Sequence, residues 1–259
     1  MGPLGLHGGG EFLPGDEPFL RALLAAARPA AAERAQSCLP APADGRDPAA
    51  IRVVVVPTAA ARQRPDLAVA MAEEAFRRIE AATGQTIRFE SVPILDRRSA
   101  DAARWAGLLA AADLVYLPGG DPDVAPAVLA GTLALRAITA ARARGAVVAG
   151  ASAGAMALAA WTWTPAGSRA GLGIVPGLVV APHFEPSALD RWRERITMAA
   201  AGLGLLGLSE RTGVLSIGRS GDDHGRTWRV FGPGSARWYP PGAGDPIVAR
   251  GAETLVLPG

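Results

Sequence analysis

Three short, largely apolar runs, each followed by a turn residue and then by a helical pattern, constrain the fold of this chain most. The runs lie at residues 51–56, 113–117 and 146–149. A run of this kind is typical of a strand that is buried on both faces of a parallel sheet. The helical patterns lie at residues 65–82, 124–144 and from residue 153 onwards. This alternation predicts an α/β fold, in which helices cover both faces of a mostly parallel central sheet.

The remaining segments extend this pattern and then change it. Further strands are expected at residues 3–7 and 86–92, and further helices at residues 18–32, 100–111 and 186–201. Short strands are expected at residues 161–164, 178–181, 213–217 and 227–231, the last two forming a hairpin. Because no linker separates these segments, we expect one domain over residues 1–259. The predicted architecture is a three-layer αβα sandwich with extra β hairpins near the C-terminus.

Composition and charge narrow the classes of function. Hydrophobic residues make up 49% of the 259 residues, enough to bury a large core. The 26 basic and 24 acidic residues give a net charge of +2, so we expect no nucleic-acid partner. The single cysteine, Cys38, excludes an intramolecular disulfide and fits a reducing compartment. We find no signal-peptide pattern and no run of about twenty apolar residues, and therefore expect a cytoplasmic protein without a membrane span.

The junction after the third apolar run carries the pattern Gly-x-Ser-x-Gly, with Ser152 between Gly150 and Gly154. When a strand turns abruptly into a helix, small neighbours allow the backbones to pass closely and the residue at the tip is exposed. A serine at such a tip is a candidate nucleophile. The same five residues also fit an ordinary strand-to-helix turn in an alanine-rich chain.

A serine needs a base to take its proton, and histidine is the usual base near neutral pH. The chain has three histidines. His183 directly follows an apolar strand pattern and is the strongest candidate. His7 fits a core or loop role, and His224 lies in a polar hairpin tip where a solvated side chain is expected.

An acid is expected to orient the histidine and to stabilise its charged form. Glu210 lies between two apolar segments, where a carboxylate can be partly buried, although a turn carboxylate would have the same setting. Glu185, Asp190 and Glu194 are nearer to His183 in sequence, but they lie on or before an arginine-rich helix that faces solvent.

Backbone N–H groups are expected to bind the oxyanion that forms during acyl transfer. Ala153, the residue after the serine, is the natural first donor. The pair Gly119 and Gly120 follows the neighbouring predicted strand and supplies candidates for the second donor.

These residues together resemble the serine peptidases of the dipeptidase E and cyanophycinase group, which share the class I glutamine amidotransferase-like fold. The motifs that carry the resemblance are Gly-Gly-Asp at residues 119–121, Gly-Ala-Ser-Ala-Gly-Ala at 150–155, Pro-His-Phe at 182–184, Glu-x-Thr at 210–212 and Gly-Gly-Gly-Glu at 8–11. They cover most of the chain, in the order that the family has.

The resemblance implies that Ser152 is the nucleophile, His183 the general base and Glu210 its orienting acid. It implies cleavage near acidic residues, at an N-terminal aspartyl dipeptide or at a β-aspartyl linkage, with no metal or other cofactor. It leaves a homodimer open.

Substrate residues are less well marked. Asp121 belongs to the Gly-Gly-Asp motif, and Arg191, Arg193 or Arg195 would pair with a substrate carboxylate, although a solvated helix face also explains these arginines. The chain departs from cyanophycinases at residues 122 and 181–182, and from dipeptidase E at Asp121, where that enzyme has Asn.

Two other functions fit the same sequence. An α/β-hydrolase esterase uses the same elbow, but with the histidine after the acid, which would favour His224. A catalytically silent member of the fold would keep the elbow for structural reasons and act as a binding or sensor protein.

Overall fold

The computed structural model describes residues 1–37, 47–164, 167–197, 202–217, 227–242 and 244–257. Among these residues, the larger of two sheets has eight strands, in the order β14 (Thr254–Val256), β11 (Thr227–Phe231), β10 (Gly213–Ser216), β1 (Leu4–His7), β5 (Val147–Ala151), β4 (Leu114–Leu117), β2 (Ile51–Val55) and β3 (Ile87–Ser91). From β1 to β3 the strands pair in parallel, whereas β10, β11 and β14 extend the sheet antiparallel. The predicted parallel core is therefore present.

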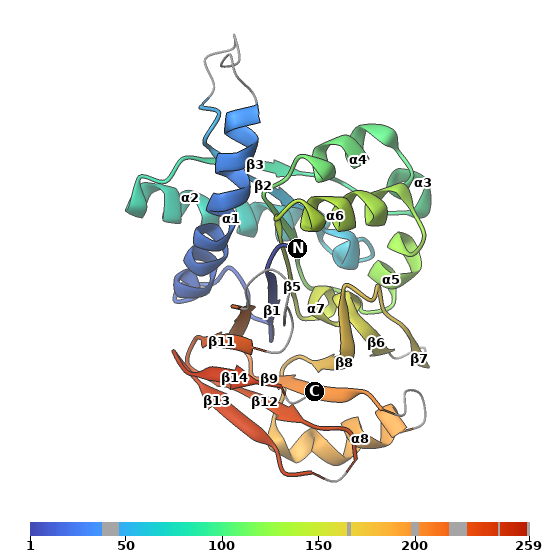
Figure 1. The fold of residues 1–259 in the computed structure, drawn as a ribbon. Helices are drawn as coiled ribbons and strands as arrows, with labels where there is room; N and C mark the ends of the chain where they lie inside the picture. Colours follow the sequence, from blue (N-terminus) through green and yellow to red (C-terminus); the bar gives the residue numbers. More distant parts are fainter. Residues whose placement is uncertain (38–46, 165–166, 198–201, 218–226, 243, 258–259) are drawn as a thin grey trace.

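Helices cover both faces of this sheet (Figure 1). The helices α1 (Glu17–Ser37) and α2 (Pro65–Thr83) pack on one face, and α3 (Arg97–Ala100), α4 (Ala103–Ala110), α5 (Val124–Leu129), α6 (Leu133–Ala143) and α7 (Ala153–Leu158) pack on the other. Successive residues of β2 face opposite sides of the sheet. Val53 and Val55 are buried in the core on the side of α1 and α2, and Val54 is buried in the core on the other side. The three-layer prediction is confirmed. None of the helices that the structure describes is both long and apolar enough to cross a lipid bilayer.

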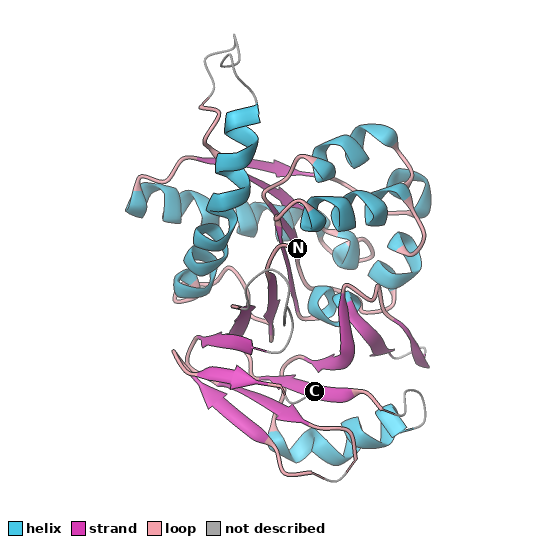
Figure 2. Ribbon diagram, viewed as in Figure 1, coloured by secondary structure: helices cyan, strands magenta, loops and turns pink. Residues whose placement is uncertain are grey.

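A second sheet lies beside the first (Figure 2). Its six strands within the described residues run in the order β13 (Ile247–Arg250), β12 (Ser235–Tyr239), β9 (Gly204–Leu208), β8 (Val175–Ala181), β6 (Ala159–Thr164) and β7 (Gly167–Ala170). The sequence predicted strands at residues 161–164 and 178–181 and hairpins nearer the C-terminus, but not that such strands form a second sheet. The hairpin of β10 and β11 does form, with Gly213 opposite Phe231, but it belongs to the larger sheet. Instead, β8 pairs in parallel with β6 and β9, which gives the second sheet its centre.

Several helix boundaries differ from the predicted ones. The helix expected at residues 100–111 forms as α4, and a separate short helix, α3, precedes it, beginning where the Asp96 side chain accepts the N–H of Ser99. A 3-10 turn, η1 (Thr58–Ala60), follows β2. The helix expected at 186–201 begins as the 3-10 turn η2 (Pro186–Ala188) and continues as α8 (Leu189–Thr197), while residues 198–201 lie outside the described residues. Cys38 and His224 also lie outside them.

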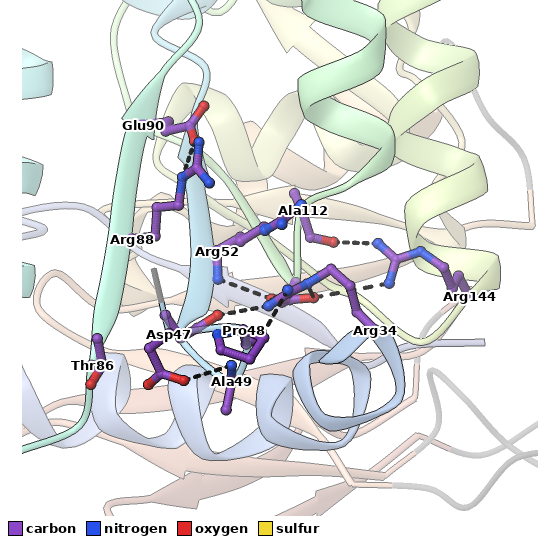
Figure 3. Close-up of polar contacts among 12 residues, drawn as sticks. Arg34, Asp47, Pro48, Ala49, Arg52, Thr86, Arg88, Glu90, Ala112 and Arg144 are labelled. Atoms are coloured by element: carbon purple, nitrogen blue, oxygen red, sulfur yellow. Dashed lines mark hydrogen bonds and ion pairs between the residues drawn. The ribbon is translucent and has the colours of Figure 1, made fainter. Parts of the chain in front are cut away.

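A polar cluster closes the amino ends of the central strands. Asp113, which is fully buried, accepts hydrogen bonds from Arg34 at 2.9 Å and from the backbone N–H of Arg52 at 2.9 Å, and it lies 3.9 Å from Arg144. Figure 3 shows Arg34, Arg52 and Arg144 converging from α1, β2 and the end of α6. We call these four residues the Asp113 cluster. It connects α1 and the end of α6 to the amino ends of the strands, and the candidate site lies at the opposite ends.

Candidate active site

Ser152 lies at the junction of β5 and α7, in a backbone conformation that non-glycine residues rarely adopt. Its φ is 47° and its ψ is −118°. Such strain persists only where the surroundings impose it. Both flanking glycines are required by close packing: a Cβ on Gly154 would lie 2.1 Å from the carbonyl oxygen of Leu117, and one on Gly150 would lie 2.7 Å from the carbonyl carbon of Gly154. The sharp turn that the sequence predicted is therefore present.

His183 meets this serine from the second sheet. It follows β8, and its φ of 49° is again in the left-handed region. Its backbone N–H donates to the carbonyl of Gly8 at 2.7 Å. Its Nε2 lies 3.0 Å from Ser152 Oγ, so a proton can pass directly between the two side chains.

Glu210 lies on the other side of the His183 ring. It follows β9, and its Oε1 is 3.7 Å from His183 Nδ1. This separation suits an ion pair but is too long for a hydrogen bond. The Glu210 side chain is 64% exposed and that of His183 is 49% exposed. Solvent therefore weakens the interaction between them.

The segment of residues 8–10 joins the loops that carry His183 and Glu210. The carbonyl of Gly9 accepts the backbone N–H of Arg211 at 2.7 Å, as the carbonyl of Gly8 does for His183. Gly9 has a φ of 113°, and a Cβ on it would lie 2.1 Å from the His183 ring. In the sequence these glycines were part of the Gly-Gly-Gly-Glu motif, which gave no sign that they contact the candidate base.

A cavity of about 450 Å³ opens beside Ser152 and His183. Its apolar wall comes from the segment after β1 and from α2, and consists of Phe12, Leu13, Leu67, Ala68 and Met71. Gly119 and Gly120 form part of its rim. This volume suits a ligand of the size of a small peptide. Within the described ranges, no group of three His, Cys, Asp or Glu side chains gathers as a metal site would require.

One predicted oxyanion donor already has a partner. The N–H of Gly119 donates to Glu11 Oε1 at 2.7 Å. Gly120 lines the cavity, and Ala153 is the first residue of α7, where a backbone N–H has no partner within its helix. In this state, Gly120 and Ala153 are the better candidates, and Gly119 would serve only if Glu11 moved away.

Buried polar groups hold the loop that carries Glu11. His7 Nε2 lies 2.9 Å from Asp16 Oδ1, and both side chains are buried. Asp16 Oδ2 also accepts the N–H of Phe12, while the N–H of Gly9 donates to His7 Nδ1. Because Nδ1 accepts the N–H of Gly9, the other ring nitrogen, Nε2, is the one that faces Asp16. His7 therefore has the structural role that the sequence suggested.

Glu11 and Asp16 also act on a nearby phenol. Burial raises the pKa of Tyr116 well above its ordinary value, and the charges of the two carboxylates raise it further. Tyr116 therefore remains protonated near neutral pH.

The predicted substrate residues do not line this cavity. The guanidinium of Arg195 lies 3.3 Å from the centre of the Trp163 ring, and burial lowers its pKa. The guanidinium of Arg193 lies 5.6 Å from the centre of the Tyr239 ring. Arg191 is an exposed residue of α8. A role for the three arginines in binding substrate stays a prediction.

Asp121 is also absent from the cavity wall, although its neighbours Gly119 and Gly120 are part of it. It pairs with Arg62 at 3.4 Å, and its Oδ1 accepts the N–H of Asp123. The contacts that the structure gives Asp121 therefore shape the loop, and its role toward substrate stays a prediction.

Comparison with known proteins adds the family. The model of peptidase family S51 matches residues 23–222. The chain belongs to peptidase family S51. This S51 protein is therefore a serine-type peptidase. No curated protein sequence matches it.

Solved structures agree with this membership. A peptidase from an acI-B1 Actinobacterium is 26% identical, with a TM-score of 0.74, and the alignment covers 99% of this S51 chain and 97% of that one. A putative peptidase E protein from Listeria monocytogenes EGD-e is 14% identical, with a TM-score of 0.57 and coverage of 96% and 98%. The second likeness shows the fold alone.

Proposed function

We propose that the protein hydrolyses small peptides or β-aspartyl linkages, with Ser152 as nucleophile, His183 as general base and Glu210 as orienting acid. The observation that carries the proposal is the 3.0 Å distance between Ser152 Oγ and His183 Nε2, at a strained strand-to-helix elbow. Nucleophile and base within hydrogen-bond reach are the signature of covalent acyl transfer.

The reaction would proceed in two steps. Ser152 Oγ attacks the carbonyl carbon of the scissile bond while its proton passes to His183 Nε2. The oxyanion that forms is bound by the N–H groups of Ala153 and Gly120, and each such donor contributes about 3 kcal/mol of transition-state stabilisation. His183 then protonates the leaving amine, which departs and leaves an acyl-enzyme. A water molecule that gives a proton to His183 hydrolyses this ester and restores the serine.

Glu210 acts only through His183. At 3.7 Å from Nδ1 it favours the protonated imidazole that exists after Ser152 has lost its proton. Since Glu210 is mostly exposed, this contribution is smaller than that of a buried acid.

The cavity supports a small substrate. Its apolar wall would receive an uncharged side chain next to the scissile bond. Pro122 and the 181–182 pair stand where cyanophycinases carry substrate-binding side chains, so a short peptide is the favoured substrate and a β-aspartyl linkage the second.

The test is activity on a panel of dipeptides together with labelling by a fluorophosphonate. We expect cleavage of at least one Asp-X, Glu-X or β-aspartyl dipeptide, and a covalent adduct on Ser152 that Ser152→Ala lacks. Folded protein that neither reacts with the reagent nor cleaves any member of the panel would refute the proposal.

The esterase alternative requires a different histidine. Under it, His224→Ala abolishes hydrolysis and His183→Ala does not; under our proposal the outcomes are reversed. The 3.0 Å contact with Ser152 favours His183.

A binding or sensor protein is the second candidate. Its support is that one of the three predicted oxyanion donors, the N–H of Gly119, is already engaged by Glu11. A silent protein would bind peptides from the panel without cleaving them, which calorimetry and product analysis would distinguish.

A further inference from the structure

Glu11 has no part in the mechanism proposed above, yet it lies in the same cavity as the candidate nucleophile. Glu11, Gly119 and Ser152 line that cavity together. Both side chains lie next to Gly119: a Cβ added to this glycine would lie 3.0 Å from Glu11 Oε1 and 3.1 Å from Ser152 Cβ. A carboxylate therefore stands beside the serine that would attack the substrate.

The Glu11 carboxylate accepts a hydrogen bond from an uncharged backbone N–H group. Glu11 Oε1 accepts the N–H of Gly119 at 2.7 Å. Arg64, the arginine of the cavity wall, pairs instead with Asp66 at 2.9 Å. An ionised carboxylate has two oxygens with about four lone-pair sites, so one amide bond leaves Glu11 able to accept further donors. A cationic donor from a ligand would satisfy both its charge and its remaining acceptor sites.

We propose that Glu11 binds the α-ammonium group of the substrate, so that the protein selects peptides with a free N-terminus. This inference rests on the proposed function, because it takes Ser152 as the attacking group. In a peptide, the α-nitrogen lies only about 2.5 Å from the carbonyl carbon of its own residue. A carboxylate next to the nucleophile therefore suits an α-ammonium, whereas a lysine ammonium lies at the far end of a four-carbon stem.

Glu11 also disfavours substrates that lack this cation. Negative charge develops on the substrate oxygen in the transition state, and a bare carboxylate nearby opposes it. A bound α-ammonium neutralises the carboxylate and removes the opposition. The loop is fixed for this role by the buried pair of His7 and Asp16, and by the bond from Gly119.

The test compares Asp-Leu with N-acetyl-Asp-Leu in the full chain and in two variants, Glu11→Gln and Glu17→Gln. Glu17 is the matched control: it also accepts a backbone N–H at 2.7 Å, from Gly15, but it lies outside the cavity wall. Wild type and Glu17→Gln should cleave the free dipeptide with a kcat/KM about 10- to 100-fold above that of the acetylated one. In Glu11→Gln the free peptide should become slower and the acetylated one faster. A merely structural loss would slow both.

A binding measurement separates this inference from the proposed function. In a Ser152→Ala background, calorimetry should show that Glu11→Gln weakens the binding of Asp-Leu by about 10- to 100-fold. If a fluorophosphonate labels Ser152 but Glu11→Gln changes neither the peptide ratio nor this affinity, the inference about Glu11 is wrong and the hydrolase proposal stands. If Ser152 is inert while binding still depends on Glu11, the hydrolase proposal fails and the ammonium site stands. Preference for N-acetyl-Lys-Leu over Asp-Leu would overturn the α-ammonium assignment.

Discussion

The charged groups at the two ends of the larger sheet differ in how far they are buried and paired. At the amino ends of the strands, Asp113 is fully buried and Arg34 reaches its carboxylate with two nitrogens. At the carboxyl ends, Ser152 meets His183 and Glu210 from the smaller sheet, whose side chains are 49% and 64% exposed and lie 3.7 Å apart. The first arrangement is complete in the folded chain, whereas the second retains free acceptor and donor capacity.

The backbone differs between the two ends as well. The residues of the Asp113 cluster lie in or directly next to helices and strands, and none of the four has a positive φ. The candidate site instead contains four non-glycine residues with positive φ, namely Phe12, Ser152, His183 and Arg211. Strain of this kind costs on the order of 1–3 kcal/mol at each residue. The amino end of the sheet therefore contributes stability, whereas the strained backbone at the carboxyl end lowers it.

The largest effect should follow from removing the nucleophile. Ser152→Ala is expected to lower kcat by about 10⁶-fold, as the loss of a serine nucleophile does elsewhere. Its unfolding midpoint should stay close to that of wild type, because alanine meets the same φ strain. The measurement is steady-state kinetics on the best dipeptide, with chemical denaturation alongside. Ser168→Ala, on an exposed position of β7, is the control and should keep full activity.

The next effect falls on the opposite end of the sheet and concerns stability. Asp113→Ala should lower the free energy of unfolding by about 3–5 kcal/mol, because it leaves the Arg34 guanidinium buried without its partner. Urea denaturation measures this loss. The activity of each folded molecule should be unchanged. Asp66→Ala, which breaks the exposed pair with Arg64, should leave the urea midpoint unchanged. A lower kcat in folded Asp113→Ala would contradict the separation of the two ends.

A smaller loss of kcat should follow from a substitution at Gly9, which lies against the His183 ring. Gly9→Ala would place a Cβ against the His183 ring and is expected to reduce kcat by about 100-fold, through misplacement of the base. Gly84→Ala is its matched control: Gly84 also has positive φ, but nothing lies within 4 Å of the added Cβ. Both variants carry the strain of a positive φ, but the clash with the ring adds to the loss of stability at Gly9, so activity is compared per folded molecule. Equal activity in the two would show that residues 8–10 do not position His183.

The smallest effect is expected at the acid. Glu210→Gln should reduce kcat/KM by only about tenfold, equivalent to about 1.4 kcal/mol, because solvent already screens its charge. The reduction should be larger at low ionic strength than at high, where salt screens the wild-type pair as well. A loss of several thousandfold would mean that Glu210 closes onto His183 when substrate binds. The pair would then be as tightly bonded as the charged groups of the Asp113 cluster.

The parallel core was predictable from the sequence because it depends on local patterns. Strands such as β2 and β4 are short apolar runs, and each needs only its own residues to be identified. The second sheet was not predictable in this way. Its strand β9 carries Gly204 and Gly207, which weaken a strand pattern. They are required because the rings of Trp238 and Phe184 fill the space that their side chains would take.

The residues of the candidate site also differ in whether a local sequence pattern reveals them. Ser152 has a local motif, and His183 and Glu210 follow apolar segments, so the structure brings together three residues that the sequence had selected. Glu11 ends the Gly-Gly-Gly-Glu motif, but nothing in that motif gave it a role at the site, and its partner Gly119 lies 108 residues away. A contact of that separation leaves no periodicity in the sequence from which to infer it.

The division of the proposed triad between two sheets also sets when the protein can become active. Ser152 follows a strand of the larger sheet, whereas His183 and Glu210 follow strands of the smaller one, and the carbonyl of Gly8 accepts the N–H of His183 between the two. A chain still emerging from the ribosome presents its serine long before its base and acid. We therefore expect the nascent chain to be harmless to its neighbours, because hydrolysis must wait until the first strand has found residues translated some two hundred positions later.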